Sequence, residues 1–148
     1  MPSTAPLILI VDDSQDNREM YGEYLSSYGY RIREAADGEE ALKSAFELPP
    51  SLVVMDLTLP VIDGWEATRR LRADPRTSSV PVIVLTGHTQ DRHVHSARAA
   101  GCDAFLLKPC LPEELLNEIQ RLLPHYAGEP EDLCARRESM SGLRTDGE

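Results

Sequence analysis

The stretch Leu7-Ile8-Leu9-Ile10-Val11-Asp12-Asp13 places two carboxylates directly after an unbroken apolar run. A short continuous apolar run is typical of a strand that is buried on both faces of a parallel sheet. The carboxylates come at the position where such a strand would end. The stretch therefore predicts a buried strand over Leu7–Val11 that presents Asp12 and Asp13 at its carboxyl end.

Four further short apolar runs follow at fairly even intervals along the chain. They span Tyr30–Ala35, Leu52–Met55, Val80–Leu85 and Ala104–Leu107. Three of these runs are nearly continuous, which predicts strands that are buried on both faces. The run Tyr30–Ala35 alternates between apolar and polar residues instead, so we expect it to form an edge strand with one more hydrated face.

Amphipathic helical patterns fill the gaps between the apolar runs. Their apolar stripes are Met20, Tyr24, Leu25 and Tyr28; Ala41, Leu42, Ala45 and Phe46; Ala67 and Leu71; Val94, Ala97 and Ala100; and Leu115, Leu116, Ile119, Leu122 and Leu123. Beside the third stripe, we expect Arg69, Arg70 and Arg72 to form an exposed basic helix side. Because strand and helix alternate five times, the sequence predicts a parallel sheet with helices on both faces.

The alternation stops after Leu123. The remaining segment carries Gly, Pro, Ser and mixed charge with few large aliphatic residues, a composition that cannot bury enough apolar surface to fold alone. A chain of 148 residues also fits one domain of ordinary size. We therefore expect a single domain over residues 6–124 and a flexible tail over residues 125–148.

Composition narrows the class of function. The 25 acidic and 15 basic residues give a formal net charge of −10, which argues against a nucleic-acid surface. No run of about 18 apolar residues is present, so no membrane span is expected. The three cysteines, Cys102, Cys110 and Cys134, show no CxxC spacing, which favours inert thiols in a reducing cytosol. We therefore expect a cytoplasmic protein.

Polar residues follow four of the five apolar runs. Asp12 and Asp13 follow the first run, Asp56 the third, Thr86 the fourth and Lys108 the fifth. In an open α/β sheet, sites form just beyond the carboxyl ends of the strands. These five residues are far apart in sequence, and we expect them to converge at one edge of the sheet.

Such a group of residues suits phosphoryl transfer. Clustered carboxylates repel one another, and a hard cation such as Mg²⁺, which prefers oxygen ligands, relieves the repulsion. Lys108 adds a positive charge and Thr86 a hydroxyl donor for a phosphate. A carboxylate can itself accept a phosphoryl group, and Asp56, at the end of a buried strand, is the best candidate.

Taken together in this order, the motifs closely resemble the CheY-like receiver domains of two-component response regulators. No single fragment is specific, but the ordered set is, and the resemblance covers about residues 6–124. The fragments that carry it are Ile10-Val11-Asp12-Asp13, Met55-Asp56-Leu57, Pro60 with Asp63-Gly64, Val84-Leu85-Thr86-Gly87, and Leu107-Lys108-Pro109.

The resemblance implies a flavodoxin-like (βα)5 fold, a doubly wound parallel five-stranded sheet of order 2-1-3-4-5. It implies that Asp56 is the phosphoacceptor and that Thr86 and Lys108 contact the phosphoryl group. It implies a cis peptide bond before Pro109 and a switch formed by Thr86 and Phe105. The magnesium ligands that it implies are Asp12, Asp13, Asp56 and a backbone carbonyl at Thr58.

The resemblance also implies the partners. A receiver takes its phosphoryl group from a histidine kinase or a histidine phosphotransfer protein and then binds a downstream effector, which the sequence does not identify. We expect a signalling switch with no DNA-binding output domain, rather than an enzyme in the usual sense. It would act as a monomer or as a homodimer that forms on phosphorylation.

Two alternatives remain open from the residues. A degenerate receiver would bind partners without phosphorylation, although such receivers usually lose an acidic residue or the lysine. A phosphatase resembling the haloacid dehalogenase group would use Asp56 as its nucleophile. That group has a second Asp two residues later, where this chain has Thr58, and no cap domain is present.

Overall fold

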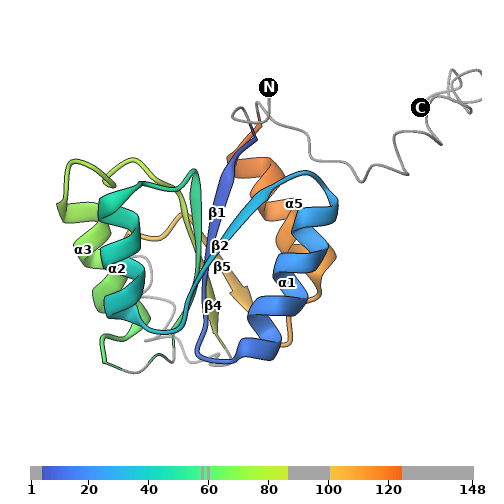
Figure 1. Ribbon diagram of the computed structural model, residues 1–148, viewed down its shortest axis with the longest axis horizontal. Coiled ribbons are helices and arrows are strands. Elements are labelled where there is room, and N and C mark those ends of the chain that lie inside the picture. Colours follow the sequence, from blue (N-terminus) through green and yellow to red (C-terminus); the bar gives the residue numbers. More distant parts are fainter. Residues whose placement is uncertain (1–4, 58, 60, 87–100, 125–148) are drawn as a thin grey trace, which may run out of the picture.

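The structure is a computed structural model, and it describes residues 5–57, 59, 61–86 and 101–124, with the backbone alone at residue 86. The tail over residues 125–148 and the apolar stripe of Val94, Ala97 and Ala100 lie outside these residues. Strands and helices alternate along the described chain, except that β5 follows β4 across residues 87–100, which lie outside the described residues (Figure 1). The elements are β1 (Leu7–Val11), α1 (Gln15–Ser27), β2 (Arg31–Ala35), α2 (Gly38–Glu47), β3 (Leu52–Asp56), α3 (Gly64–Ala73), β4 (Val82–Thr86), β5 (Ala104–Leu107) and α5 (Pro112–Leu122).

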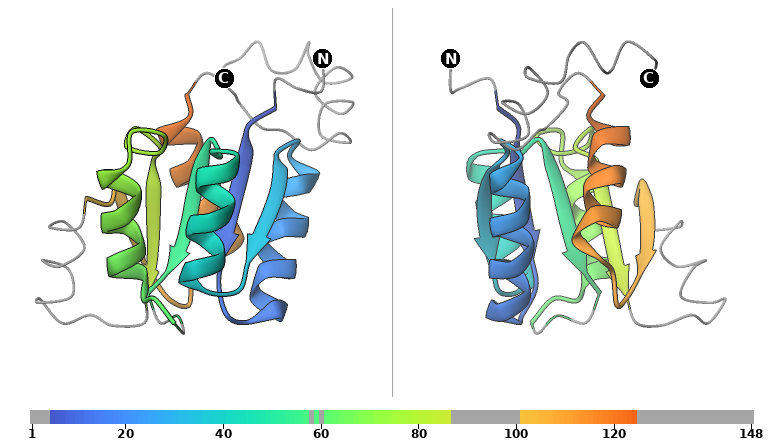
Figure 2. Two further views of the ribbon diagram at one scale, coloured as in Figure 1. Left: turned by 60° about the vertical axis from the view of Figure 1, so that its left-hand side comes forward. Right: turned by 90° about the vertical axis from the view of Figure 1, so that its right-hand side faces the viewer.

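All strand pairs are parallel, and the sheet has the order β2-β1-β3-β4-β5. The predicted order is therefore confirmed. Helices α2 and α3 cover one face of the sheet, and α1 and α5 cover the other (Figures 1 and 2). Successive strand residues point to opposite faces: Leu9 and Val11 belong to the core under α2 and α3, and Ile8 and Ile10 to the core under α1 and α5.

The two edge strands differ from each other in how well the sequence predicts them. Strand β2 lies at one edge and is partly exposed along most of its length, as its alternating pattern predicts. Strand β5 lies at the other edge, and the prediction that it is buried on both faces is wrong. Its residues are half-buried, and Leu107 is 46% exposed, because in the described part of the chain β5 pairs only with β4.

Strand β4 begins two residues later than its apolar run. Pro81 has no backbone N–H to give to the sheet, although its carbonyl accepts a hydrogen bond from Val53 N at 2.9 Å. Val80 belongs to the preceding turn, where its N–H donates to Thr77 O. The strand therefore starts at Val82 and ends at Thr86.

Three helices begin with side-chain caps. Ser14, Asp37 and Asp63 each accept a hydrogen bond from the backbone N–H three residues later, at the starts of α1, α2 and α3. Within α1, the predicted apolar stripe is wrong at one position. Met20 is 43% exposed, and Tyr21 is the buried residue that packs beside Leu25.

The arginines of α3 do not form one exposed side. Arg69 and Arg70 are exposed and both pair with Glu66, as expected for a solvent face. Arg72 instead turns inward, where it donates to Gly101 O at 2.8 Å and pairs with Asp103. Within the described residues, no helix is both long and apolar enough to cross a membrane.

Candidate functional site: an acidic cluster beside a lysine

The carboxyl ends of β1, β3 and β5 bring three predicted residues to one edge of the sheet. Asp12 follows β1 directly, and its backbone N–H donates to Ala35 O of β2 at 3.1 Å. Asp56 is the last residue of β3, in the sheet interior, and pairs in register with Leu85 of β4. Lys108 follows the end of β5. The predicted convergence is therefore observed for these residues.

Lys108 lies between two buried carboxylates. Its Nζ is 3.2 Å from Asp56 Oδ2 and 3.7 Å from Asp12 Oδ2. Asp12 is 2% exposed and Asp56 is 3% exposed, whereas the Lys108 side chain keeps 29% of its surface open to solvent. Buried carboxylates need a counter-charge, and Lys108 supplies one while it remains accessible to a phosphate from outside.

The third carboxylate, Asp13, completes an acidic cluster with Asp12 and Asp56. One oxygen from each residue lies within 4.8 Å of the others, close enough to share a metal ion. Asp13 is exposed, so the cluster is open to water on one side. An all-oxygen set that leaves room for water and phosphate fits Mg²⁺, which usually binds one or two carboxylates and retains several waters.

The start of α1 holds the Asp12 carboxylate in place. Ser14 N donates to Asp12 Oδ1 at 2.8 Å, and Asn17 Nδ2 donates to Asp12 Oδ2 at 3.3 Å. Arg18 Nη1 donates to the Asp12 main-chain oxygen at 2.6 Å. Sequence reasoning missed Asn17 and Arg18. Their spacing from the cap residue Ser14 in the first turn of a helix was the available signal.

The loop after Asp56 returns tightly against the end of β3. Gly64 N donates to Leu57 O at 3.1 Å. A Cβ placed on Gly64 would lie 2.5 Å from Asp56 O and 2.8 Å from Leu57 Cα. Real Cβ atoms essentially never make contacts that short. Glycine at residue 64 therefore permits the close approach of α3 to the backbone of Asp56.

The structure describes three further predicted residues to different extents. Thr86 ends β4 and pairs in register with Leu107, but its side chain lies outside the described part of the structure. Thr58 lies outside it altogether, so the expected backbone ligand is untested. Phe105 lies on β5, half-buried, and packs against the core under α2 and α3. The peptide bond between Lys108 and Pro109 is cis, as expected.

A groove of about 530 Å³ opens beside Lys108, between the first half of α1 and the start of α5. Exposed Met20 and buried Tyr21 line it on α1, and Tyr21 Oη donates to Cys110 O at 2.7 Å. Cys110 is buried, as expected, and burial raises the pKa of its thiol to about 11, which disfavours the reactive thiolate.

Comparison with known proteins agrees with the fold and with the geometry at the sheet edge. Residues 8–120 match the family described as the response regulator receiver domain. The chain belongs to this family, whose members are signalling switches of two-component systems that interact with histidine kinases. Receiver domains bind Mg²⁺ in their active site, which accords with the acidic cluster of Asp12, Asp13 and Asp56.

Relatives of known sequence and structure resemble most of the chain. It is 36% identical to the DNA-binding dual master transcriptional regulator RpaA of Synechocystis over 118 residues, which are 80% of this chain and 49% of RpaA. The chain thus spans about half the length of the curated relatives it matches. The chemotaxis protein CheY4 of Vibrio cholerae has 33% identity and a TM-score of 0.77, with 80% of this chain and 99% of CheY4 covered.

A third relative has a metal ion in its structure. The receiver domain of the sensor histidine kinase PA1611 from Pseudomonas aeruginosa has 35% identity and a TM-score of 0.76. The similarity covers 82% of this chain and 99% of that one. The PA1611 structure has a magnesium ion coordinated in its active-site cleft.

Proposed function

We propose that the chain accepts a phosphoryl group on Asp56 from a histidine kinase or a histidine phosphotransfer protein. The observation that carries the proposal is the position of the Asp56 carboxylate, 3.2 Å from Lys108 Nζ and within the acidic cluster. A buried carboxylate beside both a cation site and a fixed ammonium group is suited to attack a phosphorus atom whose charge must be neutralised.

In the proposed reaction, an Asp56 carboxylate oxygen attacks the phosphorus of a phosphohistidine. The new bond joins that oxygen to phosphorus, the P–N bond breaks, and the departing imidazole nitrogen keeps the electron pair and takes up a proton. Asp12, Asp13, Asp56 and the Thr58 backbone carbonyl would hold Mg²⁺, which supplies charge neutralisation for the phosphoryl oxygens. Lys108 and the Thr86 hydroxyl would contact those oxygens.

The proposed output is a change in partner binding. Thr86 and Phe105 lie on neighbouring strands, and Phe105 pairs in register with Val84 of β4. A contact between Thr86 and the phosphoryl group would bias the position of Phe105 and so alter the surface around β5. We assign this switch to a domain over residues 6–124, with residues 125–148 as a tail and an effector protein as the partner.

The test is the intact mass of the full-length protein after incubation with acetyl phosphate, with and without Mg²⁺. The proposal predicts a single phosphoryl adduct that requires Mg²⁺ and is absent from Asp56→Asn. A short-lived adduct could escape detection by mass, so the second reagent is beryllofluoride, a phosphate mimic. Its binding is monitored by nuclear magnetic resonance. If neither reagent changes the wild-type protein, the chain is a receiver that binds partners without phosphorylation.

A further inference from the structure

We infer that Arg18 is a positioning residue for the cation site, because its guanidinium fixes the peptide between Asp12 and Asp13 and so the direction of the Asp13 carboxylate. The inference rests on the proposed magnesium-dependent function. It extends that function to Arg18, a positively charged residue that lies outside the cluster of negatively charged carboxylates.

The guanidinium of Arg18 is held by two hydrogen bonds. Its Nη1 donates to the Asp12 main-chain oxygen at 2.6 Å, and its Nε donates to Glu34 Oε1 at 2.9 Å. The Arg18 side chain is only 14% exposed, whereas that of Glu34 is 42% exposed. A guanidinium so largely removed from water is stabilised by hydrogen bonds from its N–H groups to protein oxygens, so these two contacts favour the position in which it lies.

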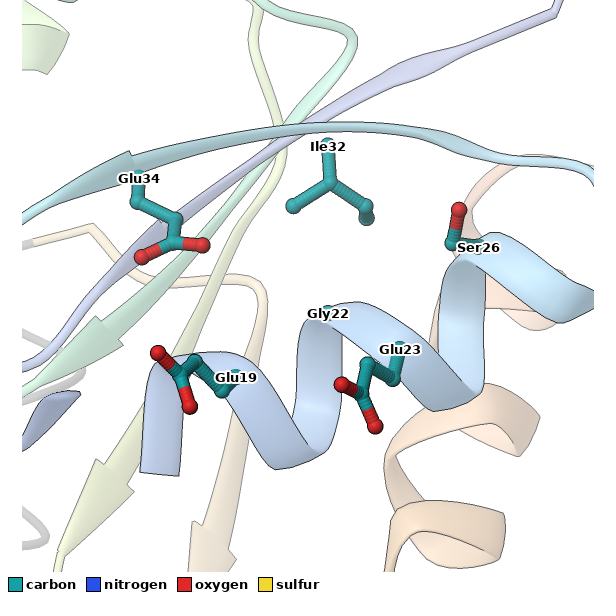
Figure 3. Close-up of a pocket in the computed structure, with 6 residues that line it drawn as sticks. All are labelled: Glu19, Gly22, Glu23, Ser26, Ile32 and Glu34. Carbon is teal, nitrogen blue, oxygen red and sulfur yellow. The ribbon is translucent and has the colours of Figure 1, made fainter. Parts of the chain in front are cut away.

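Glu34 connects this arrangement to the sheet. It lies on β2 and lines a groove between β2 and α1, and Figure 3 shows its carboxylate leaning from the strand toward the helix. The next residue, Ala35, accepts the hydrogen bond from Asp12 N at 3.1 Å. Both main-chain polar groups of Asp12 are therefore anchored to β2, the N–H directly and the carbonyl through Arg18 and Glu34.

This anchoring matters most for Asp13. The Asp12 carboxylate has its own hydrogen bonds, from Ser14 N and Asn17 Nδ2. The Asp13 side chain is exposed, and it reaches the cluster from the residue that follows the anchored carbonyl. Because the peptide unit is planar, fixing the Asp12 carbonyl also fixes the N–H of Asp13 and restricts the direction of its side chain.

The charge of Arg18 has the opposite effect on a bound cation. A guanidinium near the site repels Mg²⁺, so its charge alone would weaken binding, and its removal would strengthen binding. Loss of a group that orients a metal ligand typically weakens binding about 10- to 100-fold. The direction of the change in Mg²⁺ affinity therefore separates a positioning role from a purely electrostatic one.

The test is calorimetric titration of the full-length protein with MgCl₂ at fixed ionic strength, together with thermal unfolding of the magnesium-free protein. The variants are Arg18→Met, which removes charge and donors, and Arg18→Gln, which removes the charge but keeps a donor. The matched control is Arg121→Met on α5, because Arg121 is also an arginine in an ion pair, with Glu118, but is exposed.

We expect Arg18→Met to bind Mg²⁺ about tenfold more weakly than the wild type. Arg18→Gln should recover part of that loss, and Arg121→Met should change the affinity by less than about twofold. Equal or tighter binding by Arg18→Met overturns the inference. If Arg18→Met does not fold, equal or tighter binding by Arg18→Gln overturns it. A wild type that binds no Mg²⁺ overturns the proposed function and this inference together.

Discussion

Lys108 Nζ lies 3.2 Å from Asp56 Oδ2, so the ammonium group neutralises the buried carboxylate to which we assign phosphoryl transfer. The same nitrogen is 3.7 Å from Asp12 Oδ2. In this position Lys108 competes with a dication for the two carboxylates and would also meet the oxygens of an incoming phosphoryl group. The first effect weakens metal binding, whereas the second favours phosphorylation.

Replacing Lys108 by Met should separate these effects. We expect Mg²⁺ to bind several-fold more tightly, because a competing cation is removed. Phosphorylation by acetyl phosphate should slow by on the order of 100-fold, because the phosphoryl oxygens lose a donor. Titration calorimetry and timed intact-mass measurements check the two results. Lys43→Met, at the exposed lysine of α2, is the control. Weaker Mg²⁺ binding by Lys108→Met would contradict this account.

Gly64→Ala should disturb the site through the backbone of Asp56. The new Cβ would lie 2.5 Å from Asp56 O, so the end of β3 or the start of α3 must move. We expect a loss of about 1–3 kcal/mol in the free energy of unfolding and slower phosphorylation of Asp56. Urea unfolding and intact mass measure the two changes.

Gly22→Ala is the control for Gly64→Ala. A Cβ on Gly22, inside helix α1, would meet among the described residues only Ile32 Cγ2 of β2, at 3.4 Å, an ordinary van der Waals contact. Alanine should therefore leave stability unchanged or raise it by up to about 1 kcal/mol, since it favours the helix more than glycine does. Equal losses for the two variants would show that the contact of Gly64 with Asp56 is not the cause.

The parts of the fold and site that sequence reasoning predicted depend on local pattern. The apolar runs before Asp12, Asp56 and Lys108 identify strands, and in a parallel sheet the ends of strands meet at one edge. That rule was enough to bring these three residues together. The sheet order was predicted from the resemblance to receiver domains, and the edge position of β2 from its alternating pattern.

The features that sequence reasoning missed depend on how helices and strands pack against one another. A run of apolar residues does not tell whether a strand is paired on both sides, so the half-buried edge strand β5 was predicted as an interior one. Met20 and Tyr21 are adjacent on α1, and only the packing against α5 decides which of them is buried. The contact between Arg18 and Asp12 likewise requires the helix to fold back over the strand end.

The ionisation of Tyr21 makes the stability of the fold depend on pH in the alkaline range. Burial, and then the charges of nearby groups, raise the pKa of Tyr21 from 10.0 to about 12. The unfolded chain loses this proton from about pH 10 upward while the folded chain keeps it. The contribution of Tyr21 to stability is therefore complete below about pH 10 and is lost as the pH rises toward 12.

The substitution Tyr21→Phe tests this dependence. At neutral pH it should cost about 1 kcal/mol, because Cys110 O loses a buried donor at 2.7 Å. As the pH rises to about 11, the wild type should lose stability faster than the variant, so the difference between them should narrow. Urea unfolding at the two pH values measures the difference. A constant difference would mean that Tyr21 keeps its ordinary pKa in the folded protein.

Arg72 should contribute more to stability than any other arginine of α3. Its guanidinium donates to three carbonyl groups, Gly101 O at 2.8 Å, Ser78 O at 3.0 Å and Val80 O at 2.5 Å. It also pairs with Asp103, whose carboxylate accepts a hydrogen bond from Val82 N at 2.8 Å. Arg72 therefore ties the end of α3 to the starts of both β4 and β5.

Arg72→Met should lower the free energy of unfolding by about 2–4 kcal/mol, because these acceptors lose a charged donor and Asp103 loses its counter-charge. Arg70→Met is the matched control on the same helix. Arg70 is exposed and pairs only with Glu66 among the described residues, at 2.9 Å, and pairs so open to solvent contribute about 0–1 kcal/mol. Urea unfolding measures both variants. A loss for Arg72→Met no larger than for Arg70→Met would show that solvent replaces the contacts of Arg72 at little cost, and that sheet pairing and packing hold β5 against β4 without them.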